Sequence, residues 1–168
     1  KYPDFPKKGI LFRDIFPIFR QPAAVKALIT HFAKYVKAHI AAKGLDKIDV
    51  VVGLDARGFL LGPLLALELD SAFAPVRKSG KLPGEVVQFE YVKEYGTDAF
   101  EMQADAVKAG QNVVIVDDLL ATGGSAGAAE KLVLQRGANV VLDLFVVELE
   151  ELRGSENLVG TVYSILKC

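Results

Sequence analysis

Two adjacent carboxylates followed by small and hydroxyl residues are the part of this sequence best suited to chemistry. They lie in VVIVDDLLATGGS, residues 113–125, directly after four apolar residues that predict a buried strand. Asp117 and Asp118 can accept hydrogen bonds from a sugar diol, or share a metal ion with a phosphate. The turn is followed by a predicted helix, whose first N–H groups lack partners and attract anions. The segment therefore predicts a site for a phosphorylated sugar.

The turn itself has the composition of a phosphate-binding loop. Gly123 and Gly124 let the main chain approach a phosphate, and Thr122 and Ser125 add hydroxyl donors. The sequence contains neither G-x-x-x-x-G-K-[ST] nor a G-x-G-x-x-G after a strand, which excludes two common phosphate motifs. A solvated acidic strand end would have the same local pattern, and that alternative stays open at this point.

Charged residues also follow two other predicted strands. They are Asp55, Arg57, Arg77, Lys78 and Lys81. A single arginine or lysine is ordinarily a solvated surface charge, but parallel strands bring their carboxyl ends to one edge of the sheet, where ligands bind. The cations are therefore expected beside the acidic pair. This charge pattern suits a substrate with a phosphate group at each end and a diol between them.

The elements that must position these residues alternate between strands and helices. Expected strands cover residues 48–54, 72–76, 112–117, 139–147 and 162–166, and expected helices contain residues 25–40, 58–69 and 125–136. Since the strands are apolar on both faces, the pattern predicts an α/β protein whose parallel sheet is covered on both sides.

Two segments do not follow this alternation. Residues 1–21 are rich in proline and aromatic residues and predict no regular element. Residues 79–103 predict a protruding hairpin with a turn at Gly96, hinged near Gly80 and Gly84. The hairpin is either an antiparallel extension used for dimerisation or a mobile lid over the site.

The composition limits the class of protein. A chain of 168 residues without repeats is expected to form a single domain, and its net charge of −1 favours neither nucleic acid nor an anionic membrane as a partner. Cys168 is its only cysteine, which excludes a disulfide within the chain. With no apolar run of spanning length and no signal-peptide pattern, a cytoplasmic location is expected.

Several segments together resemble a known family. VVIVDDLLATGGS is similar to the phosphoribosyl pyrophosphate motif of type I phosphoribosyltransferases. PDFPKKGILFRDI, GLDARGFLLGP, VRKSGKLPGE and EYGTDAFEMQ resemble the adenine-specific members, in the same order from Tyr2 to about Glu150. The resemblance implies the type I phosphoribosyltransferase fold for a single domain, residues 1–168: a central, mostly parallel sheet flanked by helices. Residues 1–21 would be an N-terminal base-binding segment and residues 79–103 a flexible hairpin lid.

The resemblance also implies a reaction, in which adenine displaces pyrophosphate from phosphoribosyl pyrophosphate to give AMP. It implies a homodimer, and Mg²⁺ held through pyrophosphate, ribose and water near the acidic pair. The 5-phosphate would bind at Ala121, Thr122, Gly123, Gly124 and Ser125, the ribose at Asp117 and Asp118, and the pyrophosphate at Asp55, Ala56, Arg57, Arg77, Lys78 and Lys81. The peptide bond between Asp55 and Ala56 would be cis.

The same resemblance assigns the base and the catalytic group. Adenine would lie near Leu11, Phe12, Arg13 and Leu119. GILF is equally a good core segment, so a packing role for it stays open. Glu94 would accept the proton that adenine loses, or stabilise the charge that develops on the base, and Tyr95 would shield the site. Without the resemblance, Glu94 would be read as a solvated loop acid.

Three other functions are weighed against this one. An enzyme for 6-oxopurines would need a donor, typically lysine, after residues 139–147, where this chain has Glu148, Glu150 and Glu151. A regulator acting on nucleic acid would need a basic face or an added module. An inactive subunit would be expected to lack Glu94 or the acidic pair, and both are present.

Overall fold

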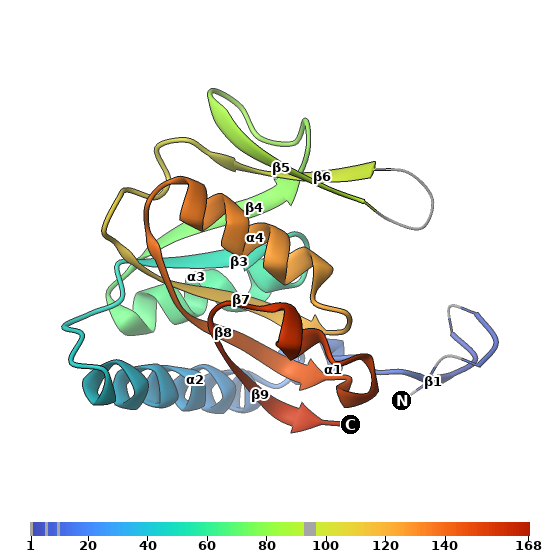
Figure 1. The fold of residues 1–168 in the computed structure, drawn as a ribbon. Helices are drawn as coiled ribbons and strands as arrows, with labels where there is room; N and C mark the ends of the chain where they lie inside the picture. Colours follow the sequence, from blue (N-terminus) through green and yellow to red (C-terminus); the bar gives the residue numbers. More distant parts are fainter. Residues whose placement is uncertain (1, 6, 10, 93–96) are drawn as a thin grey trace.

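A seven-stranded mixed sheet forms the centre of the molecule (Figure 1). The computed structural model describes residues 2–5, 7–9, 11–92 and 97–168. The strand order is β5-β6-β4-β3-β7-β8-β9, and β4, β3, β7, β8 and β9 are mutually parallel. The strands are β3 (Val50–Leu54), β4 (Ala72–Lys78), β5 (Val86–Val92), β6 (Thr97–Gln103), β7 (Asn112–Leu120), β8 (Asn139–Glu148) and β9 (Thr161–Lys167). The five expected parallel strands are therefore confirmed.

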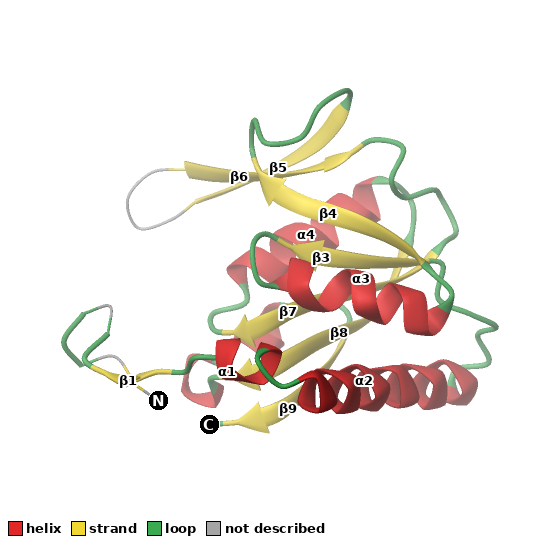
Figure 2. Ribbon diagram, turned by 180° about the vertical axis from the view of Figure 1, so that it is seen from behind, coloured by secondary structure: helices red, strands yellow, loops and turns green. Residues whose placement is uncertain are grey.

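Helices cover both faces of this sheet, as the apolar strands predict. Helices α2 (Pro22–Ala42) and α3 (Gly58–Leu69) cover one face, and α4 (Gly124–Gln135) covers the other (Figures 1 and 2). In β3, Val51 belongs to the core on the α2 and α3 side, whereas Val50 and Val52 belong to the core beneath α4. Alternate side chains of one strand thus fill two separate cores.

No helix among the described residues is long and apolar enough to cross a membrane.

The expectation that residues 1–21 form no regular element is wrong. Strands β1 (Tyr2–Pro3) and β2 (Leu11–Phe12) pair antiparallel, and α1 (Phe16–Phe19) is a single helical turn. A turn between the two strands is closed by Asp4, whose carboxylate accepts a hydrogen bond from the N–H of Gly9 at 2.7 Å. Elements of two to four residues are too short to produce a hydrophobic period, which explains why the pattern did not reveal them.

The hairpin expected within residues 79–103 is confirmed as an extension of the main sheet. β5 and β6 pair antiparallel from Val86 opposite Gln103 to Val92 opposite Thr97, and β6 also pairs with β4. The predicted turn at Gly96 lies outside the described residues. The described ends of the hairpin project from the same edge of the sheet as the N-terminal segment (Figures 1 and 2).

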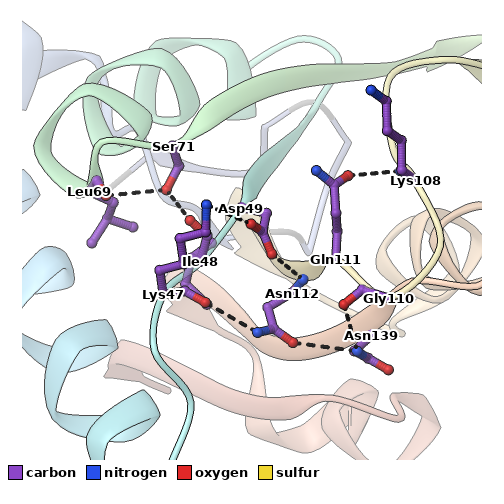
Figure 3. A network of polar contacts seen from close by, with 10 residues as sticks. All are labelled: Lys47, Ile48, Asp49, Leu69, Ser71, Lys108, Gly110, Gln111, Asn112 and Asn139. Carbon is purple, nitrogen blue, oxygen red and sulfur yellow. Dashed lines mark hydrogen bonds and ion pairs between the residues drawn. The ribbon is translucent and has the colours of Figure 1, made fainter.

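Polar contacts join the amino ends of the parallel strands, opposite the carboxyl ends where a ligand site is expected (Figure 3). The carboxylate of Asp49 accepts a hydrogen bond from the N–H of Asn112 at 2.8 Å, and the Asn112 side chain donates to the carbonyl of Lys47 at 3.2 Å. The hydroxyl of Ser71 donates to the carbonyl of Ile48 at 2.7 Å. These contacts connect the entries to β3, β4 and β7, so they help to hold the register of the strands while the carboxyl edge stays available for a site.

Two buried acids, Asp143 of β8 and Glu130 of α4, lie in the interior of the protein. Asp143 is fully buried, and its carboxyl oxygens have no hydrogen-bond donor among the described residues. Burial, and then the neighbouring charge of Glu130, raise the pKa of Asp143 well above its ordinary value. Glu130 in α4 accepts hydrogen bonds from the N–H groups of Val159 and Gly160 at 2.7 to 2.9 Å. A proton on Asp143 therefore lets the two acids coexist.

This arrangement predicts a specific dependence of stability on pH. The folded state keeps a proton on Asp143 that the unfolded chain loses at about pH 4, so stability falls as pH rises from there toward the raised pKa. Asp143→Asn cannot ionise, and its amide can donate to Glu130. We expect the Tm of the variant, followed by circular dichroism, to decline less between about pH 5 and about pH 8 than that of the parent. Asp46→Asn, at an exposed acid, is the control, and parallel curves for parent and Asp143→Asn would contradict the role.

Candidate active site

A cavity of about 290 Å³ lies at the carboxyl edge of the parallel strands. It is lined by Asp55, Arg57, Asp117, Asp118, Leu119, Leu120, Ala121, Thr122, Gly123, Gly124, Ser125, Ala126 and Phe145. The cavity is thus bordered by the acidic pair, by the whole predicted phosphate turn and by Arg57, one of the predicted cations. They come from the ends of β3, β7 and β8 and from the start of α4, which is the edge expected for a ligand site in such a sheet.

Burial and the charge of one arginine have opposite effects on the pKa values of the acidic pair. Asp118 is 3% exposed and lies 3.1 Å from the guanidinium of Arg57, while the carboxylate of Asp117 accepts the N–H of Asp118 at 2.9 Å. Burial, and then the charge of Asp118, raise the pKa of Asp117 to about 8. Burial also raises the pKa of Asp118, and the charge of Arg57 opposes that rise. The pair therefore retains a proton near neutral pH.

A second acid and arginine pair lies on the neighbouring strands. Nε of Arg77, at the end of β4, donates to the carboxylate of Asp55 at 2.8 Å. Another nitrogen of the same guanidinium donates to the carbonyl of Lys81 at 3.1 Å. The peptide bond between Asp55 and Ala56 is cis, as the sequence resemblance implies. Arg77 thus connects the cavity wall at Asp55 with the turn that carries Lys81.

The predicted phosphate turn ends in an open helix N-terminus. Gly123 is the residue before α4, has a φ of +84°, and no side chain caps the helix. The main chain of Gly154 packs directly behind it, since a Cβ on Gly123 would lie 2.5 Å from the Gly154 carbonyl oxygen. The amide of Asn157 donates to the carbonyl of Thr122 at 3.0 Å. The uncapped N–H groups of α4 and this braced turn can bind a phosphate.

Residues expected around the base are only partly brought to the cavity. Leu119 lines it. Phe12 contacts Arg57, which lines the cavity: the guanidinium carbon is 5.9 Å from the centre of the Phe12 ring. Leu11 and Arg13 are in the N-terminal segment beside Phe12 but are not among the residues that line the cavity. The structure therefore connects the N-terminal segment to the site through the contact of Phe12 with Arg57.

Two expected cations do not line the cavity, and two expected residues of the lid are not described. Lys78 and Lys81 are exposed residues beside Arg77 and are not among the lining residues. Glu94 and Tyr95 fall outside the described residues. The roles expected for these four residues stay predictions, as do the roles expected for the residues that line the cavity.

Sequence reasoning missed the residues behind the phosphate turn. Gly154 and Asn157 belong to the 3-10 helix η2 (Gly154–Asn157), which follows η1 (Glu150–Leu152) in the connection to β9. A Cβ on Gly154 would lie 2.1 Å from the carbonyl oxygen of Ala121, so this position requires glycine. The only available signal was a glycine among charged residues, which ordinarily indicates a turn and no more.

The carboxylates of the site are too few to hold a metal ion alone. The part of the chain that the structure describes contains no group of three or more histidine, cysteine, aspartate or glutamate residues suited to a metal. The Oδ2 atom of Asp118 already lies 3.1 Å from Nε of Arg57 in their ion pair. Mg²⁺ typically uses one or two carboxylates together with water and phosphate oxygens. Asp117 and Asp118 therefore fit a Mg²⁺ ion that is held mainly by a ligand and by water.

Comparisons with known proteins agree with this geometry. Residues 18–149 match the family model described as the phosphoribosyl transferase domain. The chain is 53% identical over 168 residues to an adenine phosphoribosyltransferase of Eremothecium gossypii, covering 99% of this chain and 88% of the relative. A crystal structure of adenine phosphoribosyltransferase from Saccharomyces cerevisiae, complexed with an imino-altritol bisphosphate and adenine, superposes with a TM-score of 0.90 at 52% identity, covering 98% and 92% of the two chains.

A more distant structure extends the comparison. Adenine phosphoribosyltransferase from Trypanosoma brucei, in complex with AMP, pyrophosphate and ribose-5-phosphate, superposes with a TM-score of 0.83 at 26% identity, covering 98% of this chain and 73% of that one. The family model covers most of the chain, and the high-identity relatives share one description over nearly its full length. On these grounds, and with a cavity that joins a phosphate turn to an acidic pair, the chain belongs to the adenine phosphoribosyltransferases.

Proposed function

We propose that this protein transfers the 5-phosphoribosyl group of phosphoribosyl pyrophosphate to N9 of adenine, giving AMP and pyrophosphate. One observation carries the proposal: the acidic pair, Arg57 and the open N-terminus of α4 border a single cavity. The cavity offers amide donors for a phosphate and carboxylates for a diol, which are the two features of a phosphorylated ribose. The ligands named for the solved relatives from yeast and Trypanosoma brucei support the same substrates and products.

The sugar phosphate would be held from two sides. The N–H groups and hydroxyls of residues 121–125 bind the 5-phosphate, and the positive end of the α4 dipole faces it. Asp117 and Asp118 accept hydrogen bonds from the ribose hydroxyls. Arg57 balances the charge of Asp118, so that an anionic ligand is not repelled by the acids that bind its sugar.

The departing pyrophosphate would be received at the edge formed by β3 and β4. Arg57, Arg77, Lys78 and Lys81 supply positive charge there, and the main chain at Asp55 and Ala56 borders the same region. Positive charge that is already in place stabilises a leaving group as its negative charge develops. Asp117 and Asp118 would help to hold a Mg²⁺ ion, and this ion would supply positive charge that neutralises part of the charge on the leaving group.

Adenine would bind between the N-terminal segment and Leu119, with main-chain groups near Leu11 and Arg13 reading the edge of the base. The ring of Phe12, which already lies near Arg57, supports this placement. Glu94 would accept the proton lost from the base or stabilise the charge on it, and Tyr95 would shield the site. Both would be brought in by residues 79–103, acting as a lid.

We also propose that the protein is a homodimer and acts in the cytoplasm. Leu60, Leu64 and Leu67 of α3 are exposed, Leu67 at 81%, and exposed apolar groups on one helix support a contact with another subunit. The cytoplasmic location is a prediction from the sequence and from its single cysteine.

The function is tested by product formation with a set of bases. Purified protein with phosphoribosyl pyrophosphate and Mg²⁺ is expected to form AMP from adenine, followed by chromatography, and to show little turnover with hypoxanthine, guanine or orotate. The same reaction with a chelator in place of Mg²⁺ is expected to be inactive, because the leaving group then loses its divalent partner. Turnover with hypoxanthine but not adenine would reject the base that is proposed.

The raised pKa of Asp117 predicts that sugar-phosphate binding releases a proton. Ribose hydroxyls favour the ionised carboxylate, so affinity for phosphoribosyl pyrophosphate with Mg²⁺ should increase between about pH 6 and about pH 8.5. In Asp117→Asn the residue cannot ionise, so affinity should be lower and its pH dependence shallower. Calorimetry on both proteins isolates Asp117, because the phosphates of the ligand ionise alike in the two titrations. Parallel pH profiles would show that Asp117 does not ionise on binding.

The catalytic role of Glu94 is tested against another acid of the same hairpin. Glu94→Gln removes the proton acceptor and should lower kcat by about 10² to 10⁴-fold, with a smaller effect on KM for adenine. Glu90→Gln, at an exposed residue of β5, is the matched control and should retain parental kcat. Pre-steady-state measurements separate chemistry from product release, and a parental rate of the chemical step in Glu94→Gln would remove this residue from the mechanism.

A further inference from the structure

A buried carboxylate in β6 holds the turn that carries Lys81. Glu101 is 1% exposed, and its side chain accepts hydrogen bonds from three successive main-chain N–H groups. They belong to Gly80 at 3.0 Å, Lys81 at 2.7 Å and Leu82 at 2.7 Å. The side-chain amide of Gln88 in β5 adds a fourth donor at 3.2 Å. The turn is therefore built around the side chain of a different strand.

The conformation of the turn depends on this arrangement. Gly80 has a φ of +78°, in the left-handed region, which lets successive N–H groups converge on one acceptor. Nothing lies within 4 Å of a Cβ added at Gly80, so the glycine is required for its conformation and not for space. The net pKa of Glu101 is lowered, which keeps the side chain charged. Burial alone would raise this pKa, but the hydrogen bonds from the main-chain donors outweigh the effect of burial.

The held turn is connected to the cavity by hydrogen bonds. The carbonyl of Lys81 accepts a hydrogen bond from Arg77 at 3.1 Å, and Arg77 donates to Asp55 at 2.8 Å. Asp55 lines the cavity. In the sheet, Glu101 is also the direct neighbour of Arg77 across the β4 and β6 pairing. A displaced turn would thus move Lys81 and remove the hydrogen bond that its carbonyl accepts from the Arg77 guanidinium.

We propose that Glu101 is a positioning residue for the pyrophosphate half of the site, acting through the 79–82 turn and Arg77. This role rests on the proposed function, and it assigns a task to a residue that touches no substrate. Because the 5-phosphate turn lies on other elements, at the end of β7 and the start of α4, loss of Glu101 should weaken pyrophosphate binding selectively. A residue that merely supports the fold would weaken both halves.

The experiment measures the two halves separately with the full chain. Glu101→Gln keeps the shape of the side chain but replaces one acceptor oxygen with a donor that faces main-chain N–H groups. We expect its Kd for pyrophosphate with Mg²⁺, measured by calorimetry, to rise about tenfold or more, and its Kd for ribose 5-phosphate to stay within about twofold of the parent. KM for phosphoribosyl pyrophosphate should rise, and KM for adenine should not.

Glu130→Gln is the matched control. Glu130 is also 1% exposed and also accepts main-chain N–H groups, but these belong to Val159 and Gly160, in the connection to β9, and not to the 79–82 turn. It should lower Tm without a selective loss of pyrophosphate affinity. Gly80→Ala is the second variant, and it serves if Glu101→Gln does not fold. It disturbs the same turn at an exposed position with open space around it, and should weaken pyrophosphate binding in the same selective way.

Two results would overturn the role. One is parental pyrophosphate affinity in Glu101→Gln or, if that variant does not fold, in Gly80→Ala. The other is an equal loss of affinity for pyrophosphate and ribose 5-phosphate in Glu101→Gln. A parent protein that binds neither ligand would instead reject the proposed function, and this role with it.

Discussion

The ion pair between Arg57 and Asp118 is the interaction on which the site depends. Carboxylates of Asp55, Asp117 and Asp118 border one cavity, and an anionic ligand can enter only if their charge is balanced. Arg57 lies 3.1 Å from Asp118, and Arg77 lies 2.8 Å from Asp55. A buried acid without such a partner would cost several kcal/mol or remain protonated. The proposed ligand exchanges these contacts: its phosphates meet the arginines, and its hydroxyls meet the acids.

Main-chain amides are used in two contrasting ways around this cavity. At the 79–82 turn, the N–H groups are occupied by the carboxylate of Glu101, so they shape the protein and are not available to a ligand. At the start of α4, the N–H groups have no side-chain cap and lie at the cavity. Main-chain N–H groups therefore help to fix the position of Lys81 at the 79–82 turn, whereas at the start of α4 they remain available to an anion. The difference is decided by whether a neighbouring strand places a carboxylate against the turn.

Gly123 and Gly154 add a steric constraint to this electrostatic one. Each would place a Cβ within 2.5 Å of a carbonyl oxygen of the other segment, so the phosphate turn and η2 pack main chain against main chain. Asn157 then donates to the turn at Thr122. Contact of this kind fixes a loop without large side chains and leaves its amide face toward the ligand. The connection between β8 and β9 thus supports the predicted phosphate turn from behind.

The sequence by itself determined the alternation of strands and helices, the parallel direction of the central strands and the acidic pair before a glycine turn. These follow from local periodicity and from residue types that are adjacent along the chain, such as Asp117, Asp118 and residues 121–125. Only the tertiary structure decided that Arg57 pairs with Asp118, that Glu101 holds the 79–82 turn, and that Gly154 backs Gly123. These partners are about 20 to 60 residues apart along the chain. Nothing in the local pattern of either partner specifies the other, because the contact exists only once strand order and register bring them together.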